Sequence, residues 1–560
     1  MLRLLIKPRT DESKDHWHGL VESRKTGTIR ENNQQVWVKT TKLFDELISI
    51  NTTKKNNKYH TMTKPKYLYG AAVQGIQGFI FQTDKLKDIV GGSELIEHIC
   101  TKFFEDQVED FDKSKLIIGA AGNIKYLFEE FEACQKIVAN FTKSVMELAP
   151  GISISQAVVE TDGDLKLKHI NELEDKLKVQ RNKQVVPINF GYLITERARN
   201  TGNVAVGFDK FDKNESIDNS TLKKRKALDS LTGLSEKFTL PEGKRFPFDF
   251  EEMVKNTDRS WIAVVHADGN GLGKVLQQLG AKLQDKSENE LIKAYKEFSE
   301  NLEKSTLKAA NSAFKNVFIN SEKGRSKQEF FPFRPIVLGG DDLTVIVRSE
   351  YVLDFTHNFL IEFEKETSNN LNPLFKRYDI KIERLTACAG IAYIKSSFPF
   401  HYGCDLAEQL CSEAKKQAKK INEVNVPSCL MFHKVQTSFI GAFDEIVKQE
   451  LTCYDGLSFV AGPYYLNQPG KISVKNLQDN SKTLNLEGAP SGQLRKWLTE
   501  RYQNNNKAKA LMERTIQVLN MDNQRNKYIE YLDLNPVKYM DNKAACPYYD
   551  YISMASLLKN

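Results

Sequence analysis

The sequence predicts an α+β fold in which one β-α-ββ-α-β unit occurs twice. The first copy lies between residues 67 and 162, and the second between residues 259 and 420. In each copy an apolar strand is followed by a helix, a tight hairpin, a second helix and a closing strand. This repeated order indicates a duplicated ferredoxin-like unit, an antiparallel sheet with helices on one face.

Length and composition are those of a multidomain globular protein. The chain has 560 residues, of which 40% are hydrophobic and 27% charged, and this length is too great for one core. We find no apolar run of 18 residues, so no membrane span is expected. The first residues, "MLRLLIKPRTDESK", contain too short an apolar stretch for a signal peptide.

The net charge and the cysteine pattern limit the expected binding partners and cellular compartment. The net charge of +7 is compatible with nucleotide or RNA partners but does not argue for them. The eight cysteines are scattered and form no C-x-x-C pair. A disulfide framework or a four-cysteine zinc site is therefore not expected, and the natural compartment is a reducing cytoplasm.

The first copy follows a polar, lysine-rich linker, "TTKKNNKYHTMTK", which closes an N-terminal extension of residues 1–64. A strand is predicted from Tyr67 to Val73 and an amphipathic helix from Ser93 to Phe104. The segment "SKLIIGAAGNIKYLFEE" indicates a strand, a turn of small residues and a second strand. A helix over about 129–148 and the strand "GISISQAVVETD" complete the copy.

The second copy begins with "RSWIAVVHADGNGLGKVLQQLG", a strand that runs into the start of a helix. Helical sequence fills residues 285–316, and the hairpin "PIVLGGDDLTVIVR" follows. A helix near 350–366, the strand "LTACAGIAYIK" and the helix "DLAEQLCSEAKKQAKKI" close the unit.

The hairpin of the second copy carries two adjacent carboxylates. Its four central residues are Gly339, Gly340, Asp341 and Asp342, and the glycines supply positive φ at a tight turn. One interpretation is ordinary turn chemistry on a solvated tip. The other is a carboxylate pair that repels itself until a hard divalent cation such as Mg²⁺ binds. The corresponding tip of the first copy, Gly119–Asn123, has no carboxylate, which weighs toward the cation.

A third carboxylate is expected beside this hairpin. In a ferredoxin-like sheet the first strand lies next to the hairpin, so Asp268, at the end of "VVHAD", should converge with Asp341 and Asp342 on one or two cations. A glycine-rich turn follows directly, formed by Gly269, Asn270, Gly271, Leu272, Gly273 and Lys274. Its backbone N–H groups could approach a triphosphate at a helix start. The alternative is a helix-start loop without a ligand.

Two other polar residues have alternative interpretations. Lys415 lies on the last helix of the second copy. It either contacts the triphosphate or belongs to a solvated helix face. His266 shares a strand face with Asp268, and we expect it to pack beneath the nucleotide site, because one histidine cannot supply the ligands of a two-metal nuclease.

These motifs resemble the large polymerase-like subunit of type III CRISPR effector complexes, whose Palm domains are related to GGDEF cyclases. That family carries a Gly-Gly-Asp-Asp hairpin in its second Palm, matched here by residues 339–342, and a D-G-D-x-M-G-like segment, matched by "DGNGLG". The segment "AAVQGIQGFIFQTDKLKDIVGGSELI" is similar to the first Palm, with Gln77 and Ser93 in register. The resemblance covers about residues 66–435.

The resemblance implies five segments. They are an N-terminal extension and linker (1–64), a first Palm with a degenerate hairpin (65–165), an inter-Palm domain (166–258), a second Palm (259–435) and a helical C-terminal domain (436–560). The family often has an HD nuclease domain, but this chain contains no His-Asp dipeptide. It often has an inter-Palm zinc site, but residues 166–258 contain no cysteine, so no zinc is expected. Asn270 stands where the family has an aspartate.

The function implied is the synthesis of a cyclic oligoadenylate second messenger from ATP in antiviral defence. Asp268, Asp341 and Asp342 would be catalytic and would hold Mg²⁺ or Mn²⁺. Nucleotide would contact the glycine turn (269–274), the hairpin glycines Gly339 and Gly340, Lys415 and, from the first Palm, Gln77 and Ser93. Guide or target RNA and other effector subunits would be partners.

Two alternatives stay open at this point. One is a stand-alone nucleotide cyclase that acts outside a CRISPR complex. The other is a catalytically silent scaffold that binds RNA and proteins. The three retained carboxylates argue against a scaffold, because a pseudoenzyme has no reason to keep three like charges together.

Overall fold

The structure is a computed structural model that describes most of the chain from residue 64 to residue 558. Within that range it leaves out residue 121, segments 184–193, 211–213, 256–259, 322–329 and 438–440, and parts of 523–542. The predicted N-terminal extension, up to residue 63, lies outside the described residues. No helix in the described segments is both long enough and apolar enough to cross a bilayer.

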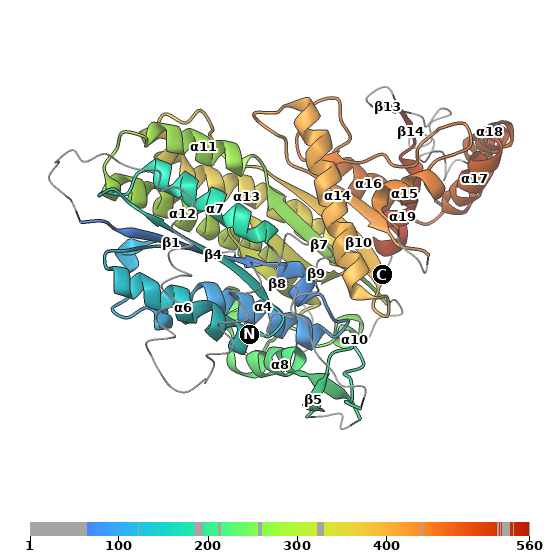
Figure 1. Ribbon diagram of the computed structural model, residues 1–560. Helices are drawn as coiled ribbons and strands as arrows, with labels where there is room; N and C mark the ends of the chain where they lie inside the picture. Colours follow the sequence, from blue (N-terminus) through green and yellow to red (C-terminus); the bar gives the residue numbers. More distant parts are fainter. Residues whose placement is uncertain are drawn as a thin grey trace, which may run out of the picture. The chain divides into compact units, whose positions relative to one another are not determined.

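The first repeat is a four-stranded antiparallel sheet in the order β2-β3-β1-β4. Its strands are β1 (Tyr67–Gln74), β2 (Leu116–Ala120), β3 (Asn123–Phe128) and β4 (Ser153–Glu160). Its helices are α3 (Ile76–Ile80), α4 (Leu86–Cys100), α5 (Lys102–Gln107), the short η2 (Lys113–Lys115), α6 (Phe131–Leu148) and α7 (Leu167–Asn182). β1 is buried along nearly its whole length, because α6 and α7 both pack on it. Figure 1 shows the sheet between α7 and α6.

A small segment connects the two repeats. It contains a hairpin of β5 (Ala205–Phe208) and β6 (Ser216–Asp218), followed by α8 (Asn219–Ser230), α9 (Gly233–Glu236) and α10 (Phe250–Val254). Asp218 caps α8 by accepting a hydrogen bond from the Thr221 N–H at 2.8 Å. Arg225 of α8 pairs with Asp88 of α4. These contacts hold the connecting segment against the first repeat.

The second repeat has the same strand order. Its sheet runs β12-β11-β10-β7-β9-β8, and β10-β7-β9-β8 corresponds to β4-β1-β3-β2 of the first repeat. Its strands are β7 (Trp261–Gly269), β8 (Phe333–Gly339), β9 (Asp342–Arg348), β10 (Ala387–Lys395), β11 (Cys429–Lys434) and β12 (Tyr464–Tyr465). Its helices are α11 (Leu272–Lys282), α12 (Glu288–Phe314), the π-helical η3 (Lys315–Ile319), α13 (Ser349–Arg377) and α14 (Phe400–Ile421). The predicted α+β fold with a duplicated unit is confirmed.

The correspondence extends to the helix that follows the closing strand of each repeat. After the closing strand of the first repeat, α7 packs on β4 and β1. After the closing strand of the second repeat, α14 packs on β10 and β7 in the same way. This helix matters for the site, because it crosses the sheet beside the strand that ends in Asp268.

The C-terminal part is mainly helical. It contains α15 (Phe443–Gln449), α16 (Val474–Thr483), α17 (Ser491–Gln503), α18 (Asn505–Met521), a hairpin of β13 (Lys538–Met540) and β14 (Lys543–Ala545), and α19 (Tyr548–Leu558). The last helix packs on α13, α16 and α17, so it ties this part to the second repeat.

Two helices differ from the sequence-based expectation. α4 begins at Leu86 rather than Ser93, because Leu86, Ile89 and Val90 extend its buried face toward the N-terminus. Within this helix Gly91 packs on α8. A Cβ at Gly91 would lie 1.9 Å from the Lys224 carbonyl oxygen, so this glycine serves close helix packing. α13 continues past the predicted end near residue 366 to Arg377, because Leu371 and Phe375 prolong its buried face.

Candidate metal centre

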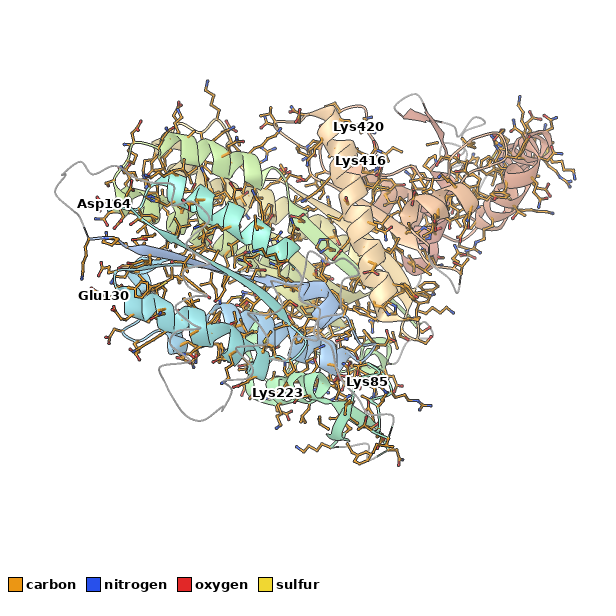
Figure 2. All side chains as sticks on the ribbon, viewed as in Figure 1. Lys85, Glu130, Asp164, Lys223, Lys416 and Lys420 are labelled. Atoms are coloured by element: carbon orange, nitrogen blue, oxygen red, sulfur yellow. The ribbon has the colours of Figure 1, made fainter. Side chains whose placement is uncertain are left out.

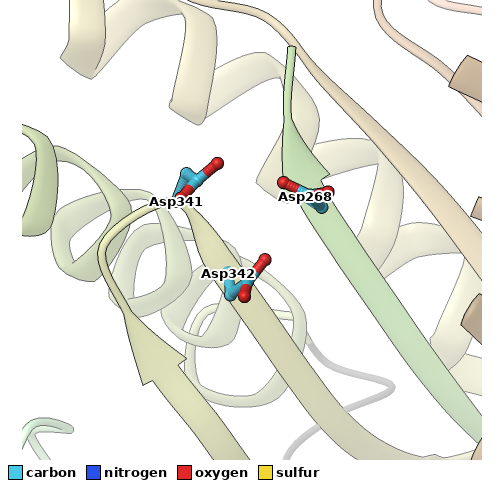
Figure 3. Close-up of side chains that lie close together, drawn as sticks. All are labelled: Asp268, Asp341 and Asp342. Carbon is cyan, nitrogen blue, oxygen red and sulfur yellow. The ribbon is translucent and has the colours of Figure 1, made fainter. Parts of the chain in front are cut away.

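Three carboxylates converge where β7 ends beside the β8–β9 hairpin. Asp268, Asp341 and Asp342 each offer an oxygen, and these oxygens all lie within 4.8 Å of one another. Figure 3 shows the three side chains directed into a common space. Three hard oxygen donors from two elements of a rigid sheet are the donor set that Mg²⁺ or Mn²⁺ prefers, so the residues fit such an ion.

The hairpin turn is shorter than the four residues predicted. Gly339 and Asp342 form the last register pair of the two strands, which leaves only Gly340 and Asp341 in the turn. Gly340 has a φ of 59°, a conformation that other residues adopt at a cost. The tight turn therefore fixes one carboxylate in the turn and one on the first residue of β9.

Register explains why Asp268 lies beside this turn. β7 pairs with β9 up to Ala267 opposite Leu343, and the next step of the same register sets Asp268 opposite Asp342. Directly opposed side chains on antiparallel strands have Cβ atoms about 4.5–5.5 Å apart. The proximity of these two acids thus follows from strand pairing alone.

Gly269 allows the turn to come close to the end of β7. A Cβ at this position would lie 2.8 Å from the Cβ of Asp341 and 2.9 Å from its Oδ2. Any other residue would push the hairpin turn away from β7. The glycine after Asp268 is therefore required by packing against Asp341, in addition to any role toward a phosphate.

The electrostatics of the cluster are those of crowded acids. Burial, together with the neighbouring Asp342 and Asp268 carboxylates, raises the pKa of Asp341 to about 8. Burial and Asp268 raise the pKa of Asp342 to about 7, against the opposing effect of Lys415. Without a cation the cluster holds protons near neutral pH, and a divalent ion would displace them.

Lys415 belongs to this cluster. Its Nζ forms an ion pair with Asp268 and donates to the Gly269 carbonyl oxygen at 2.9 Å. Its side chain is 19% exposed, whereas that of the next lysine, Lys416, is 70% exposed. Figure 2 shows Lys416 and Lys420 together near one end of α14. The lysine-rich run is thus a solvated face except at Lys415.

The glycine turn forms the start of α11. Gly271, with a φ of 74°, is the N-cap, and Leu272 is the first helical residue. Asn270 is buried, and its Nδ2 donates to Thr386 Oγ1 at 3.0 Å, while its Oδ1 has no partner among the described residues. Lys274, in the first turn, pairs with Glu423 at 2.8 Å. Gly273 has open space around it.

The two first-repeat residues predicted to contact nucleotide have different environments. Gln77 is exposed on α3. Ser93 is buried on α4, and its hydroxyl donates to the Ile336 carbonyl of β8. Within the described segments neither residue hydrogen-bonds to the three aspartates. The Ser93 contact joins the two repeats.

Sequence reasoning missed two residues around the cluster. Thr306 of α12 donates from Oγ1 to the Gly340 carbonyl at 2.6 Å and so holds the turn. Glu408 of α14 acts on Asp342 electrostatically, and burial, with Asp405, raises its own pKa to about 7. Glu408 lies two turns before Lys415, so helical periodicity was the available signal.

His266 packs below the cluster as expected. Its Nδ1 lies 3.0 Å from Thr344 Oγ1, on the strand that carries Asp342. Burial lowers the pKa of His266. The cluster of possible metal ligands found in the described part of the chain contains the three aspartates and no histidine.

The hairpin of the first repeat has the same strand register without the acids. Ala120 and Asn123 form the last register pair of β2 and β3, and Asn123 is opposite Ala72 of β1. Ala72, Gly122 and Asn123 therefore occupy the positions of Asp268, Asp341 and Asp342. Among the described residues, the carboxylate cluster belongs to the second repeat.

Comparison with known proteins identifies the domain that the second repeat resembles. Residues 261–424 match the second palm domain of Cas10/Cmr2, which confirms the resemblance that the motifs predicted. No curated protein sequence matches the chain.

Solved structures are similar to the chain at low sequence identity. The match with the apo Csm1–Csm4 cassette covers 90% of this chain and 72% of the matched chain, with a TM-score of 0.50 and 13% sequence identity. The match with a Csm1–Csm4 cassette in complex with pppApApA covers 90% of this chain and 71% of the matched chain, with a TM-score of 0.48 and 13% sequence identity. The match with Csm1 in T. onnurineus covers 89% of this chain and 70% of the matched chain, with a TM-score of 0.47 and 13% sequence identity. At this identity the likeness concerns the fold alone.

Proposed function

We propose, for a chain whose residues 261–424 are a Cas10/Cmr2-type second palm domain, that it is a metal-dependent nucleotidyltransferase that converts ATP into a cyclic oligoadenylate. The observation that carries the proposal is the cluster of Asp268, Asp341 and Asp342, with oxygens within 4.8 Å. Such a cluster would be unfavourable in a protein that had no cation to bind there.

The metal fits the residues present. Asp268, Asp341 and Asp342 would hold it. Mg²⁺ or Mn²⁺ in this position would activate a 3′-hydroxyl and offset the charge of the departing pyrophosphate. The shortness of the hairpin turn and the missing side chain at Gly269 keep the three carboxylates together before any ion binds, so little rearrangement is needed on binding.

The other residues of the site would bind the triphosphate. Lys415 lies between Asp268 and the Gly269 carbonyl, within reach of a phosphate held at the cluster. The first N–H groups of α11, at Leu272 and Gly273, favour an anion because a helix leaves them without intrahelical acceptors. Lys274 would reach a phosphate only after its ion pair with Glu423 is broken.

The reaction proposed is the attack of the 3′-hydroxyl of one ATP on the α-phosphorus of another. The O3′–Pα bond forms, the bond from Pα to pyrophosphate breaks, and the hydroxyl loses its proton. Repetition, followed by closure of the chain on its own first α-phosphorus, gives a ring. The first repeat, with Ala72, Gly122 and Asn123 at the equivalent positions, would bind the partner nucleotide without metal ligands.

The biological setting proposed is antiviral defence, as the large subunit of a type III CRISPR effector complex. Guide or target RNA and other effector subunits would be its partners, and RNA binding would trigger synthesis. A stand-alone cyclase shares the same site and differs in partners. Genes for repeat-RNA-binding subunits beside this one would favour the complex, and a lone effector gene would favour the stand-alone enzyme.

The decisive experiment is a product assay. Purified chain is incubated with ATP and Mg²⁺ or Mn²⁺, with and without the effector subunits and target RNA, and the products are identified by mass spectrometry. We expect cyclic adenylates and pyrophosphate, and neither from the Asp341→Ala/Asp342→Ala variant. If the complete complex consumes no ATP, the scaffold alternative replaces this proposal.

A further inference from the structure

A second candidate site lies at the other end of β8. A cavity of about 190 Å³, open to solvent on one side, lies where α4, the segment after α8 and the start of β8 meet. Leu228, Leu231 and Phe246 are among its apolar lining residues. The polar lining residues are Arg334, Arg245, Lys244, Glu94, Thr232 and Ser235. Arg334 is five residues before Gly339, so the cavity is separate from the carboxylate cluster.

Arg334 is the unusual feature of this cavity. The residue is only 2% exposed, and its Nε is buried without an acceptor in the described part of the chain. Its guanidinium carbon lies 5.7 Å from the Phe246 ring centre and 5.5 Å from that of Phe248. Ring faces attract a cation, but they accept none of the five N–H hydrogen bonds that a guanidinium can donate.

Glu94 interacts electrostatically with Arg334 but forms no hydrogen bond with it among the described residues. Glu94 lines the same cavity, but its Oε2 accepts from the Leu234 N–H at 3.0 Å, and no ion pair between Glu94 and Arg334 is formed in the described structure. The neighbouring Arg245 differs in this respect, because Glu252 accepts from its two terminal nitrogens at 2.9 and 2.5 Å.

The charge of Arg334 persists despite its burial. Burial lowers the pKa of Arg334 to about 10, which leaves the guanidinium positive at neutral pH. A buried guanidinium with an unpartnered Nε–H is unfavourable, and that donor calls for an acceptor that the described residues do not supply.

We propose that this cavity binds a small anion, a carboxylate or a phosphate monoester, that carries an apolar body about the size of one aromatic ring. Arg334 would bind the anionic group, and Leu228, Leu231 and Phe246 would enclose the ring. The size follows from volume, because a buried apolar cavity of about 150 Å³ accommodates benzene. A whole nucleoside triphosphate is too large for the cavity.

The position of the cavity connects it to the hairpin. Ser235, in its wall, belongs to α9, and two residues later Lys237 donates from Nζ to the Leu338 carbonyl of β8 at 2.9 Å. Lys237 also pairs with Glu97 of α4 at 2.8 Å. A ligand in the cavity would therefore brace the three elements that support the β8–β9 hairpin. The site is independent of the proposed cyclase activity.

The test uses the full-length chain and defined probes. Benzoate and phenyl phosphate carry the ring and the charge, benzamide carries the ring alone, and inorganic phosphate carries the charge alone. Melting temperature and calorimetric Kd are measured for each probe. We expect a saturable rise in melting temperature with benzoate or phenyl phosphate and none with the other two. The stronger of the two active probes identifies the anionic group.

Variants separate the site from a structural role. Arg334→Met removes the unsatisfied cation, so it should fold with unchanged or higher stability and weaken probe binding by about 10–100-fold, the usual worth of a charged hydrogen bond. Arg377→Met, at an exposed arginine paired with Glu297, is the matched control and should bind the probes normally. Leu231→Trp fills the cavity while it keeps Arg334, and should also abolish binding.

Three results would overturn the proposal. The first is the absence of any stabilisation by both ring anions. The second is equal stabilisation of the wild type and the Leu231→Trp variant. The third is an equal response to inorganic phosphate and phenyl phosphate, which would remove the role of the ring. If Arg334→Met does not fold, the Leu231→Trp comparison still decides.

Discussion

Asn123 and Asp342 occupy the same register position in the hairpins of the two repeats. Asn123 is paired with Ala120 across its two-residue turn, and Asp342 is paired with Gly339. Each is also next to the first strand of its own sheet, at Ala72 and at Asp268. The two repeats thus offer the same backbone site with and without charge, which provides a matched pair of positions for mutagenesis.

Removing the hairpin acids should abolish synthesis. In Asp341→Ala/Asp342→Ala we expect ATP turnover to fall by more than about 100-fold, because charge stabilisation of this kind is worth at least that much. The metal-free variant should melt no lower than the wild type, because mutual repulsion is relieved. Product mass spectrometry and thermal unfolding measure the two effects.

Asn123→Ala is the control for that change. It alters the equivalent position of the first repeat, so turnover should fall by only a few-fold and the response to metal should be unchanged. Equal losses from the two variants would contradict a division of labour between the repeats.

Divalent metal should stabilise the folded chain. Mg²⁺ or Mn²⁺ binds the native carboxylate cluster and not the unfolded chain, so the melting temperature should rise with ion concentration, and further when ATP is present. The Asp341→Ala/Asp342→Ala variant should show neither rise. An unchanged melting temperature of the wild type with both ions, with and without ATP, would refute the metal site.

The stability of the metal-free chain should fall as pH rises from about 4 to about 8. In the unfolded chain the two aspartates lose their protons near their ordinary pKa of about 3.9. In the folded chain the pKa is about 8 for Asp341 and about 7 for Asp342. The native state therefore binds more protons between these limits, and its free energy of unfolding decreases with pH there.

This pH effect is measurable by difference. Unfolding in chelator is compared between the wild type and Asp341→Asn/Asp342→Asn from pH 5 to pH 9, and the gap should widen in favour of the variant up to about pH 8 and stay constant above it. Affinity for Mg²⁺ should rise over the same range, because the ion competes with protons. Parallel stability profiles would show that these aspartates titrate normally.

Lys415→Ala should lower kcat/KM for ATP by about 10–100-fold, the range expected for a lost charged hydrogen bond. The same change should strengthen Mg²⁺ binding in the absence of ATP, because a competing cation leaves Asp268. Lys416→Ala, one residue further on the exposed face, should alter neither quantity. Weaker metal binding in Lys415→Ala would mean that the lysine only positions Asp268.

The chain alone should not cleave single-stranded DNA. His266 is engaged with Thr344 and is not part of the carboxylate cluster, so it adds no ligand for a two-metal nuclease. Incubation of labelled single-stranded DNA with Mg²⁺ or Mn²⁺ should leave it intact. Cleavage that is lost in His266→Ala and kept in Asp341→Ala/Asp342→Ala would show that the role of this strand has been misassigned.

The convergence of Asp268 with the hairpin could be predicted because it depends on strand order alone. A β-α-ββ-α-β chain sets its first strand beside the hairpin, and the acids follow from their positions in those elements. The number of residues in the turn could not be predicted, since Gly-Gly-Asp-Asp is compatible with either two or four turn residues.

Tertiary contacts decided the remaining details. The sequence predicts that a lysine of the run on α14 faces the sheet, but it does not show which one. Lys415 takes this position because the buried residues Cys411 and Ala414 fix the rotation of the helix about its axis. Ser93 matched a nucleotide-site motif, yet its hydroxyl is used by β8. The unpartnered state of the buried Arg334 Nε could not be predicted, because the sequence of a strand does not show which polar side chain will lack a hydrogen-bond partner.

The contacts on β8 have a consequence for isolating the domains. β8 is the outer strand of its sheet, and successive outward carbonyls, those of Ile336 and Leu338, accept hydrogen bonds from Ser93 and Lys237. Side chains from outside the second repeat thus terminate an edge that could otherwise template another strand. A fragment that contains the second repeat alone would expose this edge, and we expect such a fragment to self-associate through β8.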